Sequence, residues 1–334
     1  MKKVAVNGLG RIGRMVLRQS FDHCPENIEI VAANDLAPTD ELAYLLRYDS
    51  VQGRASFPVG HSDNALTLGD KSVAIFNEQD PANLPWTELG VDIVLECTGR
   101  FHRKEDASKH ISAGASKVII SSPSENADLT VVLGVNEDWY DPRAHHIISN
   151  ASCTTNSLAP AVKVLNDTFG VEYLMVTTVH AYTPSQALLD RVERKRRRGR
   201  AAALSLIPES TGAATATALV IPDLKGKMDA ISVRVPVPDG AITDIVAHLK
   251  TDVSVERINE AFKRAAQGSL KDILAYNDDE IVSQDIIGDP HSGIIDAPST
   301  KVVGNRVVKV FVWYDNEYGY AMRCLDLADY IATH

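Results

Sequence analysis

The sequence predicts an α/β protein in two parts: a doubly wound parallel sheet, followed by an α+β part with a mainly antiparallel sheet. Over residues 1–152, short apolar segments alternate with amphipathic helical patterns, as in parallel sheets whose crossovers are helices. After residue 170, several segments are apolar at every second position, which is typical of antiparallel strands with one exposed face. The chain of 334 residues is long enough for two domains.

Composition and charge exclude several classes of protein. The formal net charge of −10 argues against general nucleic-acid binding. No apolar run is long enough to span a bilayer, and the first one is broken at Asn7, so no signal peptide is expected. The four cysteines lie far apart without a C-x-x-C, which favours reduced thiols in a cytosol over disulfides or a metal site: Cys24, Cys97, Cys153 and Cys324.

The first elements carry a dinucleotide-binding pattern. A short strand at 4–6 leads into Gly8-Leu9-Gly10-Arg11-Ile12-Gly13, a helical pattern follows, and a second strand at 28–33 ends next to Asp35. The glycines allow close approach of a pyrophosphate to the backbone, and an acidic residue about 20 positions later accepts hydrogen bonds from a ribose diol. The alternative is a glycine-rich turn with a solvated aspartate.

Further elements continue the alternation. A helix is expected over Thr39–Arg47, with Thr39 as its cap, and another over 102–115. Strands are expected at 91–96, 117–121, 130–133 and 146–149. Ligands of such sheets bind beyond the carboxyl ends of the strands, so Asn34, Thr98, Ser122 and Cys153 should face one crevice, with the thiol next to a nicotinamide.

Cys153 lies in the segment I-I-S-N-A-S-C-T-T-N-S, where a strand ends and a helix begins. Unpaired N–H groups and the helix dipole favour a thiolate there, so a lowered thiol pKa is expected, and the same N–H groups can hold an anion. The alternative is a buried and inert cysteine.

The second part supplies groups that would complete a thiol site. Strands are expected at 173–179, 231–235, 242–249 and 307–313, with an irregular basic segment at 181–207 and a final helix at 316–333. His180 follows the first of these strands and could carry protons and donate to an oxyanion, although most single histidines are core or surface residues. Hydroxyl, backbone and guanidinium groups suited to phosphate recur at Thr183, Ser185, Arg198, Thr211, Gly212 and Arg234.

These residues resemble those of phosphorylating glyceraldehyde-3-phosphate dehydrogenases along the whole chain. The matching segments are N-G-L-G-R-I-G (7–13), E-C-T-G-R-F (96–101), S-N-A-S-C-T-T-N (149–156), H-A-Y-T (180–183), R-A-A-A (200–203), S-T-G-A-A (210–214), R-V-P-V-P (234–238) and W-Y-D-N-E-Y-G-Y (313–320). The resemblance implies a Rossmann domain over 1–152, with helix 316–334 packed back on it, and a catalytic domain over 153–315.

The resemblance also implies roles for individual residues. Cys153 would form a hemithioacetal and then a thioester, with His180 as base and oxyanion donor. Inorganic phosphate would cleave the thioester, giving 1,3-bisphosphoglycerate from glyceraldehyde 3-phosphate. The attacking phosphate would bind at Ser152, Thr154, Arg198, Thr211 and Gly212, and the substrate phosphate at Thr183, Ser185 and Arg234. The cofactor would be held by Gly8, Gly10, Arg11, Ile12, Gly13, Asp35, Gln79, Thr98, Ser122, Asn316 and Tyr320.

Some positions depart from the pattern of the family. Ser185 replaces a common threonine but keeps the hydroxyl, and Gln79 replaces a common arginine near the adenine. Asp35 favours NAD because a carboxylate repels a 2′-phosphate. Arg191-Val192 stands where Leu-Pro often completes the NAD pattern, so Arg191, Arg194 and Lys195 keep NADP open as an alternative.

Two other functions are weighed against this one. Erythrose-4-phosphate dehydrogenase uses the same thiol and imidazole, but its relatives typically lack the H-A-Y-T and S-T-G-A-A segments. A non-catalytic RNA-binding or regulatory role is supported only by the basic run 191–200. The resemblance also implies a homotetramer. The cysteine pattern and the net charge favour a cytoplasmic protein that has neither a membrane nor a nucleic acid as its main partner.

Overall fold

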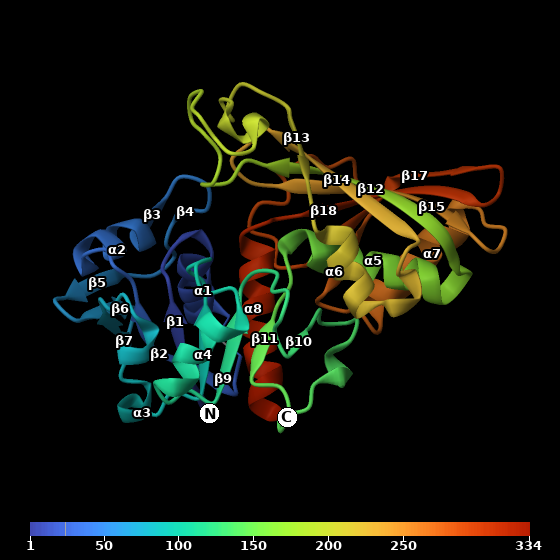
Figure 1. The fold of residues 1–334 in the computed structure, drawn as a ribbon. Helices are drawn as coiled ribbons and strands as arrows, with labels where there is room; N and C mark the ends of the chain where they lie inside the picture. The colour runs from blue at the N-terminus through green and yellow to red at the C-terminus, as the bar shows by residue number, and fades with distance from the viewer. Residues whose placement is uncertain (24) are drawn as a thin grey trace. The chain divides into compact units, whose positions relative to one another are not determined.

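The chain divides into two compact units. A computed structural model describes residues 1–23 and 25–334, and Cys24 lies outside the described residues. The first unit consists of Met1–Val131, Asp138–Ser152 and Tyr320–His334, and the second of Val132–Glu137 and Cys153–Gly319. Figure 1 labels the helices and strands of both units.

The first unit is built on a nine-stranded sheet with the order β10-β11-β9-β8-β1-β2-β7-β6-β5. All neighbours from β10 to β7 are parallel, and β6 and β5 extend the edge in antiparallel fashion. The predicted doubly wound parallel sheet is therefore confirmed. Its strands are β1 (Lys2–Asn7), β2 (Ile28–Asn34), β5 (Val59–Ser62), β6 (Ala65–Leu68), β7 (Lys71–Phe76), β8 (Ile93–Glu96), β9 (Lys117–Ile120), β10 (Leu129–Thr130) and β11 (Ile147–Ser149).

The central strands are short apolar runs because both faces of the sheet are covered. All four residues of β8 and the last four of β1 are buried, as expected for parallel strands between helical layers. The helices of this unit are α1 (Arg11–Asp22), α2 (Thr39–Arg47), α3 (Trp86–Leu89), α4 (Lys104–Ser112) and most of α8 (Tyr318–Thr333), and a small ribbon pairs β3 (Tyr48–Asp49) with β4 (Gly53–Arg54).

Several local predictions for this unit are wrong in detail. Thr39 is the first helical residue and not the cap of α2, because its hydroxyl donates to Asp63 O over 3.0 Å. The helix expected over 102–115 is shortened to α4. The antiparallel edge β5–β7 was not predicted, since its strands are too short to show a clear period.

A buried carboxylate ties the ends of the central strands together. Glu96, at the end of β8, accepts hydrogen bonds from Asn7 Nδ2 of β1 over 2.6 Å and from Thr98 N over 2.8 Å, and also from the Thr98 hydroxyl. His110 Nδ1 accepts from the Trp86 indole over 3.0 Å, so the ring hydrogen is on Nε2, which donates to Glu96 over 3.1 Å. These donors satisfy a carboxylate that is only 2% exposed.

The second unit is built on a seven-stranded sheet with the order β13-β14-β12-β15-β18-β17-β16. Four of its six pairings are antiparallel, which confirms the predicted mainly antiparallel sheet. Its strands are β12 (Val171–Ala181), β13 (Ile207–Ser210), β14 (Met228–Val235), β15 (Ala241–Leu249), β16 (Leu274–Asn277), β17 (Gly293–Val303) and β18 (Val307–Tyr314).

Burial in the second unit follows the two faces of this sheet. In β15 and β18 buried and half-buried residues alternate without a break, as the sequence predicted. Helices α5 (Cys153–Phe169), α6 (Ala213–Val220) and α7 (Val255–Gln267) cover one face of the sheet (Figure 1). Large apolar side chains on β12 and β14 remain exposed, namely Tyr173, Met175 and Ile231.

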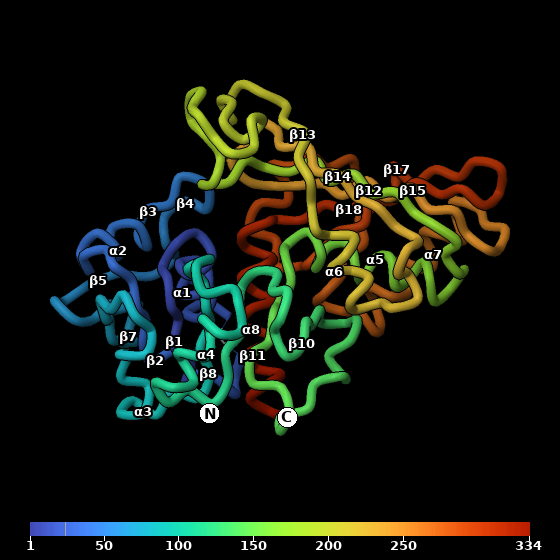
Figure 2. Tube along the Cα trace, viewed as in Figure 1, coloured from blue at the N-terminus to red at the C-terminus, as the bar shows by residue number. Residues whose placement is uncertain are grey.

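An irregular segment of residues 182–206 joins β12 to β13. Figure 2 shows it as a yellow-green excursion that contains one short 3-10 turn, Arg196–Gly199. Several of its apolar side chains are more than two-thirds exposed, namely Leu188, Leu189, Val192, Leu204 and Leu206. The predicted irregular segment is thus present, and it is anchored at both ends to the sheet of this unit.

Candidate functional site

The first unit has a cavity beyond the carboxyl ends of its central strands. Its volume is about 270 Å3. Five of the residues expected to bind a dinucleotide line it, namely Gly8, Gly10, Asp35, Gln79 and Thr98. Asp35 Oδ2 accepts from Leu9 N over 2.7 Å, and Oδ1 accepts from Ala37 N over 2.9 Å. The carboxylate is thereby fixed at the end of β2, next to the glycine turn.

The three glycines of the turn differ in whether the surrounding space excludes a side chain. Gly8 has φ +93°, and a Cβ there would lie 2.8 Å from Thr98 N. A Cβ on Gly13 would lie 2.0 Å from Gly8 O. A Cβ on Gly10 would meet nothing within 4 Å, so the space in front of this turn is open. Open space at the start of α1 fits a pyrophosphate held by backbone N–H groups, including those of Arg11 and Ile12.

Two residues expected to bind the cofactor, Ser122 in the first unit and Asn316 in the second, each have a buried polar side-chain atom. Among the described residues, Ser122 Oγ and Asn316 Oδ1 are buried and have no hydrogen-bond partner. Such groups usually find partners, and a bound ligand can supply them. Tyr320 lies in the first unit, where its hydroxyl donates to Ala151 O over 2.9 Å. Ser122, Asn316 and Tyr320 are not part of the lining of the cavity described above.

In the second unit, the thiol of Cys153 faces the imidazole of His180. Cys153 is the first residue of α5, and His180 lies at the end of β12. The distance from Sγ to Nε2 is 3.5 Å, within hydrogen-bond reach for sulfur. Two residues before the thiol, Ala151 has a left-handed φ of 53°, which is unusual for a residue with a Cβ and often marks a functional turn.

The pKa of the Cys153 thiol is raised above its ordinary value, so the predicted lowering is wrong. Burial is the main cause, and the charge of Arg234 and hydrogen bonds from Thr154 oppose it without reversing it. The position at the start of a helix is therefore not sufficient to produce a thiolate. Near neutral pH the thiol keeps its proton unless a neighbouring group accepts it.

His180 is held as a neutral imidazole. Burial and then the charge of Arg234 lower its pKa to about 3. Its Nδ1 lies 2.6 Å from Arg234 Nη1 and 2.8 Å from Ala181 O. Because a guanidinium only donates, a hydrogen bond from Arg234 places the ring hydrogen on Nε2, whereas a hydrogen bond to Ala181 leaves Nε2 free to accept the thiol proton. The position of Arg234 thus selects the tautomer.

Tyr314 contacts the imidazole of His180 and the residue that follows Cys153, Thr154. Its hydroxyl lies 3.0 Å from Thr154 Oγ1 and 2.8 Å from Thr178 Oγ1, and its ring packs edge-on against His180. It is 1% exposed, and burial raises its pKa, so the hydroxyl stays protonated. Thr154 is buried, and its hydroxyl lies between Tyr314 and the Cys153 thiol, with which it also forms a hydrogen bond.

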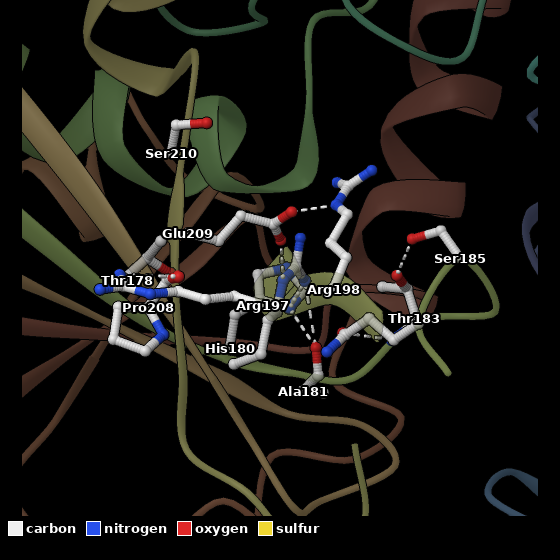
Figure 3. Close-up of polar contacts among 12 residues, drawn as sticks. Thr178, His180, Ala181, Thr183, Ser185, Arg197, Arg198, Pro208, Glu209 and Ser210 are labelled. Atoms are coloured by element: carbon white, nitrogen blue, oxygen red, sulfur yellow. Dashed lines mark hydrogen bonds and ion pairs between the residues drawn. The ribbon is translucent and has the colours of Figure 1, made fainter. Parts of the chain in front are cut away.

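Figure 3 labels three of the other residues expected to bind phosphate, Thr183, Ser185 and Arg198, together with His180. The hydroxyls of Thr183 and Ser185 are 3.0 Å apart. Thr211 and Gly212 immediately precede α6, and Thr211 Oγ1 accepts from Ala213 N. Arg198 and Arg234 both contact the carboxylate of Glu209. Ser152 is half-buried and belongs to the first unit.

Comparison with known proteins agrees with these features. Residues 152–316 match the model of the glyceraldehyde 3-phosphate dehydrogenase C-terminal domain, and residues 2–104 match that of its NAD binding domain. The chain is 54% identical over 331 residues to a glyceraldehyde-3-phosphate dehydrogenase of Geobacillus stearothermophilus, covering 99% of this chain and 98% of that protein. It is 51% identical to one of Streptomyces avermitilis (99% and 98%) and 49% identical to one of Bacillus subtilis (99% and 97%).

The chain belongs to the glyceraldehyde-3-phosphate dehydrogenase family. Two residues of its site were not singled out from the sequence. Tyr314 ends an alternating strand, where an inward-facing tyrosine must find partners for its hydroxyl. Glu209 contacts Arg198 of the preceding 3-10 turn and Arg234, which the pairing of β13 with β14 brings to it.

Two buried acidic residues, Asp239 and Asp315, hold the backbone next to Asn316 in place. Asp315 accepts hydrogen bonds from the backbone of Glu317, Tyr318 and Gly288. Asp239 is hydrogen-bonded to Asp315, and burial, together with the charges of Asp315 and Glu317, raises its pKa from 3.8 to about 9. Asp239 is therefore protonated at neutral pH and can donate to Asp315.

We expect this proton to make stability fall as pH rises. Between pH 4 and 9 the folded protein binds a proton at Asp239 that the unfolded chain releases, so the free energy of unfolding decreases with pH. Asp239→Asn keeps a donor without the titration and should flatten this decline. Thermal unfolding at pH 6, 7.5 and 9 measures it, with exposed Asp229→Asn as control; parallel curves for wild type and Asp239→Asn would contradict the assignment.

Other kinds of site are not found in the described part of the chain. Residues 1–23 and 25–334 contain no group of three or more histidine, cysteine, aspartate or glutamate side chains arranged to hold a metal ion. None of the described helices has both the length and the apolar character needed to cross a membrane. Cys97, Cys153 and Cys324 are free thiols.

Proposed function

We propose that this protein oxidises glyceraldehyde 3-phosphate with NAD and inorganic phosphate to 1,3-bisphosphoglycerate, reversibly. The observation that carries the proposal is the pairing of Cys153 with His180, a thiol and a neutral imidazole 3.5 Å apart, in a chain of this family. The combination suits nucleophilic attack on an aldehyde followed by proton transfer.

The chemistry of the first half follows from these two groups. Cys153 Sγ bonds to the aldehyde carbon while His180, in the tautomer whose Nδ1 donates to Ala181 O, takes the thiol proton on Nε2. It returns this proton to the carbonyl oxygen, giving a hemithioacetal. Bound NAD supplies the acceptor for the hydride that leaves this carbon. His180 then removes the hydroxyl proton as the carbon–oxygen double bond re-forms, and a thioester on Cys153 results. The Cys153 backbone N–H and the imidazole would stabilise the oxyanion.

The second half needs an anion site next to the thioester. Inorganic phosphate attacks the acyl carbon, the carbon–sulfur bond breaks, and an acyl phosphate leaves together with a free thiolate. We assign the attacking phosphate to Arg198, Thr211 and Gly212, with Ser152. The substrate phosphate is assigned to Thr183, Ser185 and Arg234, whose hydroxyl and guanidinium groups lie in one unit.

The initial rate of reduced-cofactor formation tests the proposal. The assay contains glyceraldehyde 3-phosphate and inorganic phosphate, with NAD or NADP. Turnover that requires phosphate supports the proposal, and absence of turnover with both cofactors contradicts it. Erythrose 4-phosphate serves as the comparison substrate, because erythrose-4-phosphate dehydrogenase is the alternative enzyme for this chain. Faster turnover with erythrose 4-phosphate would favour that alternative.

We infer that NAD is preferred over NADP from the charge around the cavity of the first unit. Its lining holds two carboxylates, Asp35 and Glu78, and one guanidinium, Arg100, so a 2′-phosphate would meet net repulsion. Two of the basic groups that could offset it have partners of their own. Arg191 pairs with Glu193 over 2.7 Å, and Lys195 donates to Ser210 Oγ over 3.0 Å.

Replacement of Asp35 should alter cofactor choice. In Asp35→Ala the ribose diol loses an acceptor, so KM for NAD should rise about tenfold, whereas KM for NADP should rise less because repulsion is also removed. Asp35→Asn keeps an acceptor for Leu9 N but removes the charge. It therefore distinguishes the effect of the charge on KM from the effect of a disturbed glycine turn. Steady-state kinetics with both cofactors measures the effect, and equal losses would place Asp35 away from the ribose.

We also propose a homotetramer in the cytoplasm. The exposed apolar residues of segment 182–206 and of the open sheet face, such as Val192 and Met175, suit contacts between copies of the chain. A free thiol at Cys153 suits a reducing compartment. The basic run is internally neutralised in part, since Arg200 pairs with Asp190 over 2.8 Å, which disfavours nucleic acid as the main partner.

A further inference from the structure

Glu209 bridges two arginines that belong to different phosphate positions of the proposed function. It lies on β13, opposite Ser232 of β14, and is 9% exposed. Its Oε1 accepts from Arg198 Nε, and its Oε2 lies 3.5 Å from Arg234 Nε. Figure 3 shows Glu209 reaching across to Arg198 beside His180. One carboxylate thus holds the guanidinium assigned to the attacking phosphate and the guanidinium assigned to the substrate phosphate.

The geometry points to a resident anion that competes with phosphate. A glutamate carboxylate presents two oxygens to two guanidinium groups, as two oxygens of a phosphate would. Without Glu209, the two partly exposed guanidinium groups would repel each other. With it, a dianionic phosphate meets one extra negative charge. We propose that Glu209 occupies the anion position between Arg198 and Arg234 when no phosphate is bound, and that phosphate binding must displace it from at least one arginine.

Arg234 also connects Glu209 to His180, the proposed base. Arg234 uses Nε toward Glu209 and Nη1 toward His180 Nδ1, with a further contact to Ala181 O over 3.1 Å. While these contacts hold, the ring hydrogen of His180 remains on Nε2. A phosphate that draws Arg234 away from Nδ1 allows the tautomer that accepts the thiol proton. Glu209 therefore sets both how tightly phosphate binds and when the base is ready.

The variant Glu209→Gln tests this competition. The amide has the same shape and still accepts from one arginine, but it carries no charge. On a Coulomb estimate for half-buried groups, phosphate binding should strengthen roughly three- to tenfold. KM for inorganic phosphate and for glyceraldehyde 3-phosphate should fall together, and KM for NAD serves as the internal reference. Glu209→Asp, which keeps the charge but shortens the side chain, should not reproduce the fall.

A charge-matched control, Glu193, lies in segment 182–206, which precedes β13 in the second unit. Glu193→Gln removes one carboxylate that pairs with Arg191 and not with the phosphate arginines. It should leave KM for phosphate within about twofold of the wild-type value. An equal fall in both variants would show a general charge effect and overturn the role of Glu209, as would an unchanged or raised KM in Glu209→Gln.

A binding measurement keeps this inference separate from the proposed function on which it rests. Calorimetric titration of the free protein with inorganic phosphate needs no turnover. Phosphate should bind more tightly to Glu209→Gln than to wild type and should raise its unfolding temperature more at the same concentration. If the enzyme assay shows no turnover but this difference is found, the proposed function fails and the competition stands. If turnover is found without the difference, only the competition fails.

Discussion

Cys153→Ala should have no detectable aldehyde oxidation, while NAD binding to the first unit is retained. The substitution removes the only sulfur within reach of His180 Nε2 in the described residues, and no other described nucleophile replaces it. The start of α5 tolerates alanine well, so the fold should persist. Initial rates at saturating substrate and a calorimetric titration with NAD measure the two halves of the prediction.

A second cysteine variant is the control for Cys153→Ala. Cys324 is a buried free thiol in α8, where its sulfur accepts from Asn150 Nδ2 over 3.4 Å. Burial raises its pKa to about 12, so it is not a thiolate at neutral pH. Cys324→Ala should keep its turnover number close to wild type. Residual phosphate-dependent turnover in Cys153→Ala would remove Cys153 from the nucleophile role.

His180→Asn should lower kcat by roughly 10²- to 10⁴-fold, as expected for loss of a general base. The pKa of the Cys153 thiol is raised by burial, so without the imidazole the thiol has no acceptor near neutral pH. With inorganic phosphate present, alkylation of Cys153 by iodoacetamide should also slow at pH 7 and recover as the pH approaches the thiol pKa.

The pH dependence gives His180 a separate signature. Because its pKa is lowered to about 3, the wild-type rate should show no loss between pH 7 and pH 5 from protonation of this ring. The rate of thiol alkylation in the free enzyme should rise with pH instead, following Cys153. A rate profile with an inflection near 6.5 that disappears in His180→Asn would contradict the lowered pKa. Unchanged alkylation in His180→Asn would show that another group activates the thiol.

The parts of the fold with strong local patterns were predictable from sequence. The parallel sheet of the first unit follows from short apolar runs such as Ile93–Glu96, and β15 and β18 follow from strict alternation. The edge strands β5 and β6 were missed because four-residue strands give no measurable period. Helix α7 was also missed, although it is amphipathic and begins after Ser254, whose hydroxyl accepts a hydrogen bond from Arg257 N.

The composition of the candidate site was more predictable than its electrostatics. Cys153 and His180 were singled out by their places at the ends of a strand and a helix, and the structure brings them together. The direction of the thiol pKa shift was wrong because it depends on how completely the surroundings exclude water, which no local pattern reports. Glu209 was missed because its contact with Arg234 depends on the register of β13 against β14, which is also not visible in the local sequence.

The hydrogen bonds around Glu96 bear on how the first unit folds. The donors come from three places in the chain: Asn7 of β1, Thr98 after β8, and His110 of α4. A sheet with β8 in place but lacking one of the others would bury a carboxylate short of a partner, at about 1–3 kcal/mol for each missing hydrogen bond. The free energy of partly folded forms is therefore higher than the loss of packing alone would make it. The central strands and α4 should consequently form and unfold as one cooperative unit.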